Sequence, residues 1–163
     1  MTQTPVVPDA RRLLEEYVAT AKVMQLATLD PDGHPYVNNL WFAWTLRPDR
    51  LFFISRPTRL HCEYIRQRPN VAGAILAIEL VDPSQPVRGV TFTGSARALP
   101  ATGIDDQIGV YQRRWPTTAA AIDPARMAAG QAHHRVYEVT VTGWVLYDEV
   151  NFRGNPRQPV PAL

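Results

Sequence analysis

The segment best suited to binding a ligand runs from Ser55 to His61, where a predicted strand gives way to a predicted helix. Ser55 and Thr58 carry hydroxyls, and Arg56 and Arg59 carry guanidinium groups. At a helix start the first backbone N–H groups are free, and the helix dipole favours negative charge. Arginine also matches the geometry of phosphate oxygens. The segment therefore predicts an anion-binding site, and an ordinary helix start with two solvent-facing arginines is the alternative.

Two adjacent amides, Asn38 and Asn39, interrupt an apolar, aromatic run that continues to Trp44. Buried amides need hydrogen-bond partners, and amide groups suit the polar edge of a flat heterocycle. This strand is expected to pair with the strand that leads into the anion-binding segment, so the two amides predict a cofactor site. Asparagines of a turn or bulge are the alternative. Taken alone, Trp41, Phe42 and Trp44 are typical of a core or of a dimer surface.

Other kinds of chemistry have little support in the sequence. The chain has neither a Gly-x-Ser-x-Gly motif nor a glycine-rich phosphate loop. Its single cysteine, Cys62, excludes an internal disulfide and a cysteine-rich metal site. The histidines lack the spacing of metal ligands, so no metal site is predicted. They are His34, His61, His133 and His134.

Composition points to one soluble globular domain. The 163 residues are 45% hydrophobic and 20% charged, which supports a sizeable core. No run approaches the roughly 20 apolar residues of a membrane helix, and the first residues do not resemble a signal peptide, so a cytoplasmic protein is expected. With 17 basic against 15 acidic residues and no long block of like charge, neither nucleic acid nor a membrane is predicted as a partner.

Hydrophobic periodicity, caps and turn residues divide the chain into strands and short helices. Asp9 and Thr58 are expected to cap helices, and Thr102 with Asp105 resembles a capping box. Asp30–Gly33 has the composition of a tight turn between strands. Helices are predicted over residues 9–22, 58–68 and 102–114, with a further Ala-rich helical stretch over 117–130, and strands over 23–29, 35–44, 51–55, 71–81, 89–99 and 134–147.

Six strands with mostly short connections predict a mainly β fold, an antiparallel sheet that closes into a small barrel with short flanking helices. Side chains fill the interior of so small a barrel, so a ligand is expected outside it or at a subunit interface. Residues 1–150 are predicted to form the single domain. Residues 151–163, which are rich in proline, are expected to form a loose C-terminal tail.

Four stretches together resemble the pyridoxamine 5'-phosphate oxidase-like superfamily, the FMN-binding split β-barrels. The resemblance covers about residues 20–150 and includes an Asp-Gly-x-Pro-x-Val turn, the strand-to-helix segment and the following Pro-x-Val-Ala. Residues 56–61 and 111–116 are most similar to a small bacterial branch, and the content of arginine and alanine is typical of a GC-rich bacterial source. The stretches are 27–44 (ATLDPDGHPYVNNLWFAW), 51–75 (LFFISRPTRLHCEYIRQRPNVAGAI), 88–99 (RGVTFTGSARAL) and 136–149 (VYEVTVTGWVLYDE).

The resemblance implies a six-stranded split barrel, FMN as cofactor, and a homodimer whose flavin sites are built from both chains. Residues 38–41 would run beside the isoalloxazine ring, and the segment from Ser55 to His61 would meet the ribityl phosphate. Trp115 or Tyr147 of the second chain would complete each cleft. The implied cofactor-binding residues are Asn38, Asn39, Leu40, Trp41, Ser55, Arg56, Thr58, Arg59, His61, Trp115 and Tyr147.

The sequence departs from the vitamin B6 enzymes of this superfamily at three places. Leu60 stands within the segment where many members carry Ser-Arg-Lys, so Arg59 and His61 would have to hold the phosphate. Gly89 replaces a glutamine of the true oxidases, and Ala43 lies near the position of a lysine. Oxidation of pyridoxamine phosphate is therefore not implied.

The resulting expectation is an FMN-dependent oxidoreductase that transfers hydride to or from a small organic substrate or a nicotinamide cofactor. No catalytic side chain is predicted, because the cofactor can carry hydride transfer alone. A reductase that uses a deazaflavin is one alternative. A non-catalytic flavin or haem binder is another, with His61 or His133 as a candidate axial ligand.

Overall fold

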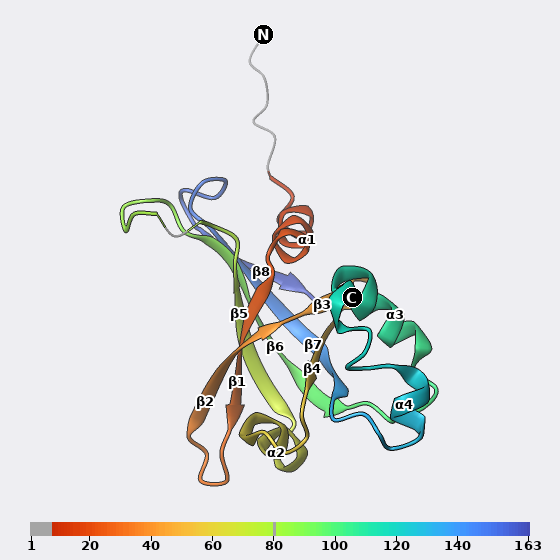
Figure 1. The fold of residues 1–163 in the computed structure, drawn as a ribbon. Coiled ribbons are helices and arrows are strands. Elements are labelled where there is room, and N and C mark those ends of the chain that lie inside the picture. Colours follow the sequence, from red (N-terminus) through yellow and green to blue (C-terminus); the bar gives the residue numbers. More distant parts are fainter. Residues whose placement is uncertain (1–7, 80) are drawn as a thin grey trace.

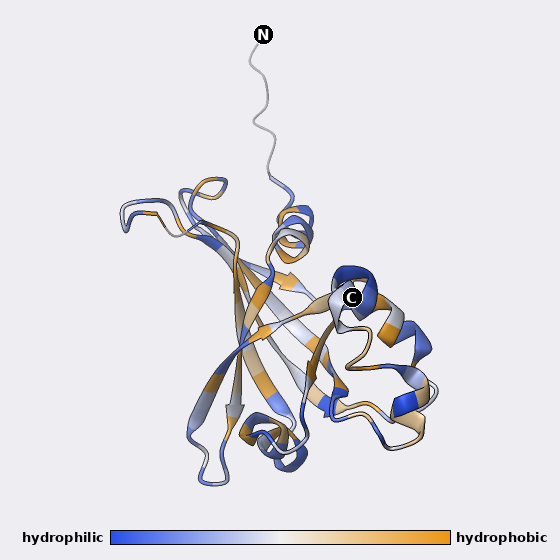
Figure 2. Ribbon diagram, viewed as in Figure 1, coloured by the Kyte–Doolittle hydropathy of each residue, from blue (hydrophilic) through white to orange (hydrophobic). Residues whose placement is uncertain are grey.

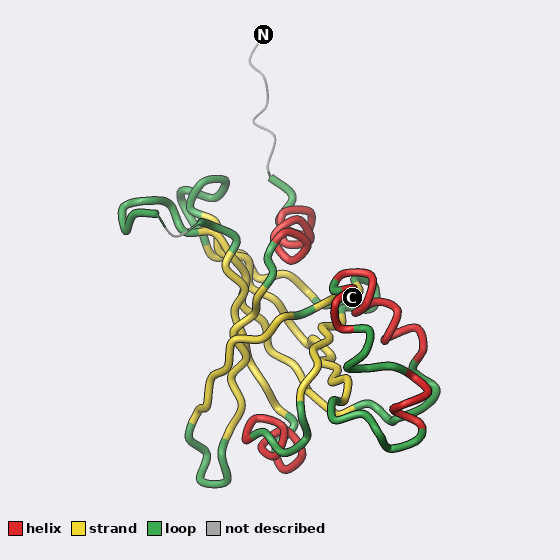
Figure 3. Tube along the Cα trace, viewed as in Figure 1, coloured by secondary structure: helices red, strands yellow, loops and turns green. Residues whose placement is uncertain are grey.

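A single curled antiparallel sheet carries the fold, with short helices at its two ends and along one side (Figures 1 and 3). The computed structural model describes residues 8–79 and 81–163. The strands in these ranges are β1 (Val23–Leu29), β2 (Pro35–Trp41), β3 (Ala43–Thr45), β4 (Arg50–Ser55), β5 (Asn70–Leu76), β6 (Arg88–Ala98), β7 (Arg135–Asp148) and β8 (Arg157–Pro161). The helices are α1 (Ala10–Thr20), α2 (Leu60–Gln67), α3 (Asp105–Arg114) and α4 (Pro124–Ala128), with the 3-10 turn η1 (Pro116–Thr118).

The strand order is β2-β1-β5-β6-β7-β4-β3, and β8 pairs with β7 beyond the end of β4. The two strands at the ends of this order, β2 and β3, are consecutive in the chain and separated only by Phe42. The sheet must therefore curl until its ends meet. This confirms the mainly β, antiparallel split-barrel type.

The predicted number of six strands is wrong, because the described residues form eight. The strand predicted over residues 35–44 is two strands, since the chain crosses at Phe42 from one end of the sheet to the other. The prediction of a loose tail is also wrong. Residues Arg157–Pro161 form β8, in which Val160 lies opposite Trp144 and is buried.

Alternation of buried and exposed residues along the strands defines the face that belongs to the core. In β1 the side chains of Met24 and Leu26 are fully buried, while Val23 and Gln25 on the other face are exposed. The barrel interior holds the larger apolar cluster, and a smaller one, which includes Ile108, fills the space between the sheet and α3 and α4. Figure 2 shows apolar residues along the strands and polar residues at the tip of the β1–β2 hairpin.

Of the predicted caps, only that of the first helix is present. Asp9 accepts hydrogen bonds from the backbone N–H groups of Arg11 and Arg12, which confirms its role. The Thr58 cap is wrong: the chain turns through residues 56–59, so α2 begins at Leu60 without a side-chain cap. The capping box at residues 102–105 is wrong as well, because the residue that caps α3 is Ile104, which has no side-chain acceptor.

Two further predicted elements are shorter in the structure. The strand predicted to reach residue 81 ends at Leu76, after which the chain leaves the ladder with β6. The helical stretch predicted over 117–130 consists of η1 and α4 with a turn between them. In the described residues, no helix combines the length and the apolar character needed to cross a membrane.

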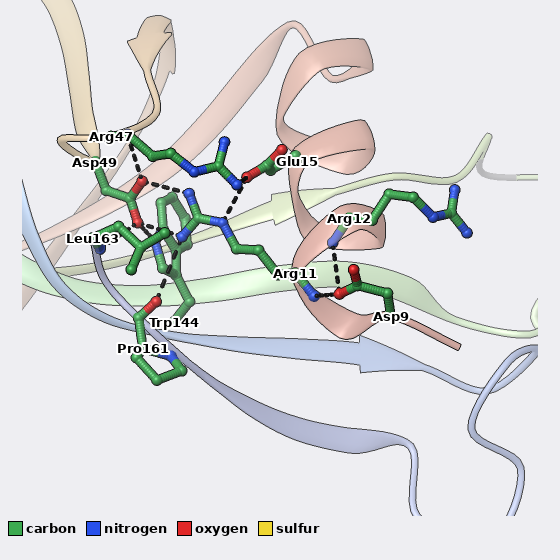
Figure 4. A network of polar contacts seen from close by, with 9 residues as sticks. All are labelled: Asp9, Arg11, Arg12, Glu15, Arg47, Asp49, Trp144, Pro161 and Leu163. Atoms are coloured by element: carbon green, nitrogen blue, oxygen red, sulfur yellow. Dashed lines mark hydrogen bonds and ion pairs between the residues drawn. The ribbon is translucent and has the colours of Figure 1, made fainter. Parts of the chain in front are cut away.

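A buried ion pair fixes the two terminal parts of the described chain to the turn before β4 (Figure 4). The carboxylate of Asp49 is fully buried and accepts two hydrogen bonds of 2.7 Å from the guanidinium of Arg11 in α1. The Nε1–H of Trp144 and the backbone N–H of Leu163 also donate to Asp49, at 2.8 and 3.2 Å. Despite the opposing effect of burial, these donors lower the pKa of Asp49 to about 2.

Candidate functional site

A cleft of about 470 Å³ lies between the edge strand β2 and the segment formed by α3 and η1. Its volume falls within the range of about 300–1,000 Å³ that is usual for ligand sites. The lining is mainly apolar and aromatic, with two threonine hydroxyls and one amide. It consists of Asn39, Leu40 and Trp41 from β2, Ile54 from β4, Tyr111 and Trp115 from α3 and its C-terminal cap, and Thr117 and Thr118 from η1.

Two hydrogen bonds join the walls of this cleft where the chain passes from β2 to β3. The Tyr111 hydroxyl donates to the carbonyl of Trp41 at 3.2 Å, and the Trp115 Nε1–H donates to the carbonyl of Phe42 at 2.8 Å. Burial raises the pKa of Tyr111 to about 12, so its hydroxyl remains a donor at neutral pH. The rings of Trp41 and Trp115 also meet edge to face, with centroids 4.8 Å apart. Helix α3 thereby holds the strand junction in place.

The pleat of β2 sends the two adjacent amides to opposite faces. Asn39 lines the cleft. Asn38 lies on the face shared with Tyr36, whose ring contacts Tyr64 of α2, and with Leu40, which packs against the core. The Nδ2 atom of Asn38 is buried and has no hydrogen-bond partner among the described residues. Of the two predicted amides, therefore, only Asn39 faces the cleft.

The predicted anion-binding segment divides into a buried and an exposed part. Ser55 and His61 are buried, and the Ser55 Oγ and His61 Nε2 atoms are 2.9 Å apart. Burial, with a smaller effect of the nearby Arg59 charge, lowers the pKa of His61, which favours the neutral imidazole. These two side chains thus serve each other as hydrogen-bond partners.

The exposed part of the segment consists of Arg56, Thr58 and Arg59. None of these three side chains takes part in a hydrogen bond or an ion pair with the rest of the described chain, so their donors are free for a ligand. They do not line the cleft. The segment nevertheless begins beside it, because Ile54, the residue before Ser55, is part of the cleft lining.

The remaining predicted residues lie in different places. Trp115 lines the cleft together with Trp41 of the same chain, as described above. Tyr147 is on β7, opposite Gly89 of β6, and its hydroxyl donates to Glu149 at 3.1 Å. It does not line the cleft.

Sequence reasoning missed Ile54, Tyr111, Thr117 and Thr118 as parts of the cleft. Tyr111 falls in the helix predicted over residues 102–114, and the motif of residues 111–116 was one signal of the family resemblance. The two threonines follow Pro116 in a stretch without a motif, so nothing in the sequence marks them.

Arg114 places a positive charge against two tryptophan rings, one of which lines the cleft. The guanidinium of Arg114 is 4.0 Å from the ring centroid of Trp44 and 5.2 Å from that of Trp115. Burial lowers the pKa of Arg114 to about 10, and one of its nitrogens, Nη1, has no partner among the described residues. Arg114 thus packs against the Trp115 ring that lines the cleft.

One group of side chains in the described residues has the composition of a metal site. Asp30, Asp32 and His34 in the β1–β2 turn have potential ligand atoms within 4.8 Å of one another. Asp30 and His34 also form the hydrogen bonds of the turn itself, at 2.8 and 3.2 Å. None of these three residues lines the cleft.

Comparison with known proteins gives one family match. A family model described as pyridoxamine 5'-phosphate oxidase matches residues 11–147. No curated protein matches the sequence significantly.

Several solved structures share the fold. A heme binding protein from Mycobacterium smegmatis is 17% identical with a TM-score of 0.76, over 96% of this chain and 60% of that protein. HutZ, the heme storage protein from Vibrio cholerae, is 17% identical with a TM-score of 0.64, over 85% of this chain and 95% of that one. A FAD-binding protein from Mesorhizobium loti is 20% identical with a TM-score of 0.63, over 84% of this chain and 92% of that one. This chain thus spans less than two thirds of the mycobacterial protein. At such identities these similarities establish the fold.

Proposed function

Because this chain belongs to the pyridoxamine 5'-phosphate oxidase family, we propose that it binds FMN in the cleft between β2 and α3 and acts as an FMN-dependent oxidoreductase. Its substrate would be a small organic molecule or a nicotinamide cofactor. The observation that carries the proposal is a cleft with aromatic walls that adjoins a segment with unpaired arginine and threonine side chains. This combination suits a flat ring with a phosphate group.

The residues present fit the two chemically different parts of FMN. Trp41 and Trp115 offer aromatic surface for the isoalloxazine ring, and the Asn39 amide offers polar groups for the ring edge. Arg56 and Arg59 have free guanidinium groups for the phosphate. When bound, the flavin supplies hydride transfer, and the chain has to orient the flavin and its substrate and exclude water. Leu60 is exposed and apolar, so it is not among the phosphate donors.

The proposal includes a homodimer, as is implied by the family. Trp41 and Val37, which share the outward face of β2, are 55% and 58% exposed. A second chain that covers this face would bury both side chains. In that arrangement Tyr147, which lies outside the cleft of its own chain, would approach the flavin of the other chain.

The test is a titration of the purified protein with FMN and with riboflavin, followed by calorimetry and flavin fluorescence. We expect FMN to bind much more tightly, because riboflavin lacks the phosphate. A charge-assisted hydrogen bond contributes about 1.5–3 kcal/mol, so Arg59→Ala should weaken FMN binding by about one to two orders of magnitude. Arg153→Ala, which removes an exposed arginine in the loop before β8, is the matched control. Equal affinity for the two flavins would contradict the phosphate assignment.

Haem is the second candidate, because two of the proteins with this fold are a heme binding protein and a heme storage protein. In this chain His133 is exposed and accessible to a haem iron, whereas His61 would first have to leave Ser55. The visible spectrum after incubation with each cofactor decides between them. A Soret band that is lost in His133→Ala would favour haem, and a flavin spectrum would favour FMN. Deazaflavin, the third cofactor considered, absorbs at shorter wavelength than FMN.

A further inference from the structure

A second cavity, of about 520 Å³, lies between α2 and the adjoining ends of β6 and β7. Figure 1 shows α2 at the lower end of the barrel. It shares no lining residue with the cleft of the proposed FMN site. Its lining combines basic, apolar and two buried polar side chains but includes no acidic residue. The lining residues are Pro57, Cys62, Ile65, Arg66, Pro69, Ala96, Arg97, Ala98, Leu99, Arg135 and Tyr137.

Three arginines from three different elements line this cavity, and two of them, Arg66 and Arg135, have no acidic partner among the described residues. Arg97 is paired with Glu138, which accepts from its Nε and Nη2 atoms at 3.1 and 2.9 Å. Arg66 donates only through Nη2, to the carbonyl of Pro57 at 3.3 Å. Arg135 donates only through Nη1, to two carbonyls of the preceding loop, each at 3.0 Å. The other guanidinium nitrogens of Arg66 and Arg135 have no partner among the described residues, and Arg66 is exposed whereas Arg135 is half-buried.

Tyr137 connects these two charges to the buried side of the cavity. Its side chain is 2% exposed and stacks on Phe53, with ring centroids 5.0 Å apart, so its position is fixed. Burial raises the pKa of Tyr137, while the charges of Arg66 and Arg135 act in the opposite direction. Both arginines line the same cavity as Tyr137. The hydroxyl stays protonated at neutral pH and can donate a hydrogen bond. The Cys62 thiol lies beside it.

We propose that this cavity is a second binding site, for a small molecule that carries a carboxylate or phosphate group. The oxyanion lies between Arg66 and Arg135 and accepts a hydrogen bond from the Tyr137 hydroxyl. The apolar part of the molecule packs against Ile65 and Leu99. Such a ligand would supply the negative charge that the lining of this cavity lacks.

The test is calorimetry on FMN-saturated protein with two probes, inorganic phosphate and glutarate. Saturation with FMN occupies the proposed flavin site, so a second anion has to bind elsewhere. We expect at least one probe to bind saturably with one site per chain. Arg66→Ala and Arg135→Ala should each weaken this binding roughly tenfold or more, and Arg153→Ala should leave it within about twofold. Binding of phosphate alone identifies a phosphate ligand, and binding of glutarate alone a carboxylate ligand.

Cys62 gives an independent readout, because it is the only cysteine of the chain and lines the cavity. The rate of its alkylation by iodoacetamide, followed by intact mass, should fall when the bound probe is present. The protection should disappear in Arg135→Ala. Circular dichroism and FMN titration should show that the arginine variants fold and keep the flavin site.

Three results would overturn the proposal. The first is no saturable binding of either probe, and the second is alkylation of Cys62 at an unchanged rate in the presence of a bound probe. The third is probe binding that Arg59→Ala abolishes but Arg66→Ala and Arg135→Ala leave intact, since the anion would then occupy the segment assigned to the FMN phosphate.

Discussion

Replacing Asp49 by asparagine removes one charge from the buried network of Figure 4 while keeping the size of the side chain. Both carboxylate oxygens of Asp49 accept hydrogen bonds from Arg11, and one of them also accepts from Trp144. An asparagine has one carbonyl oxygen and one NH₂ group. In either orientation its NH₂ would face a donor of Arg11, so at least one of these hydrogen bonds is lost.

The size of the effect follows from two observations. Lowering the pKa of Asp49 from 3.8 to about 2 corresponds to about 2 kcal/mol of stability at neutral pH. Removing one partner of a buried ion pair typically costs about 3–5 kcal/mol. The Arg11 side chain is 16% exposed, so water can still reach its charge, and the cost should lie at the lower end of that range. We therefore expect Asp49→Asn to lower the free energy of unfolding by about 3 kcal/mol at pH 7.

The direction of the pH dependence is fixed by the pKa of Asp49. Its pKa in the folded chain lies below that in the unfolded chain, so the stabilisation is fully present above pH 3.8 and is lost as the pH falls towards 2. The difference in unfolding free energy between the wild type and Asp49→Asn should therefore shrink over this interval.

Urea unfolding followed by tryptophan fluorescence measures both effects. Glu16→Gln is the control, because Glu16 forms an exposed ion pair with Arg12 and should cost less than about 1 kcal/mol. If Asp49→Asn is no less stable than this control at pH 7, or if its deficit persists unchanged at pH 2, the reasoning about the network is refuted.

Three further predictions concern the cleft, the sheet and the buried imidazole. Trp115→Phe removes the donor to the Phe42 carbonyl, so the free energy of unfolding should fall by about 1 kcal/mol and FMN should bind several-fold more weakly. Urea unfolding and flavin titration measure the two effects, and unchanged values for both would contradict a role of Trp115 in holding the cleft. Gly73→Ala places a methyl group 2.3 Å from the ring of Phe92 in β6, so it should lower the free energy of unfolding by about 1–3 kcal/mol. Gly154→Ala is the control: no atom lies within 4 Å of the added methyl group, so thermal unfolding should be nearly unchanged. Burial lowers the pKa of His61 in the folded chain below that in the unfolded chain. The contribution of the neutral imidazole to stability is therefore present above about pH 6.5 and is lost as the pH falls through the folded pKa. His61→Gln should remove this part of the pH dependence of unfolding.

Local patterns predicted the parts of the fold that local physics determines. The cap of α1 and the strand over residues 23–29 depend on neighbouring residues, and the structure confirms both. The break at Phe42 depends on hydrogen bonds from Tyr111 and Trp115, which are about 70 residues away in the chain. No local pattern contains that information, so residues 35–44 were predicted as one strand.

The same distinction applies to the candidate site. Asn39 and Trp41 were found because their types and spacing stand out in an otherwise apolar strand. Thr117 and Thr118 became part of the cleft through the packing of α3 against β3 and β4. The ion pair of Arg11 with Asp49 spans 38 residues, and arginine is so frequent in this chain that its partner could not be chosen from the sequence.

The position of β7 determines when the barrel can form during synthesis. This strand pairs with β6 along one edge and with β4 and β8 along the other, so it joins the two parts of the sheet. Until residues 135–148 have left the ribosome, β4 and β6 lack the partner for the edges that β7 covers in the finished protein. Pairing over such distances closes long loops, which makes folding slow relative to helical proteins. For most of its synthesis the chain therefore has unpaired strand edges. A molecule that binds the nascent chain at the ribosomal exit would cover these edges until β7 is made.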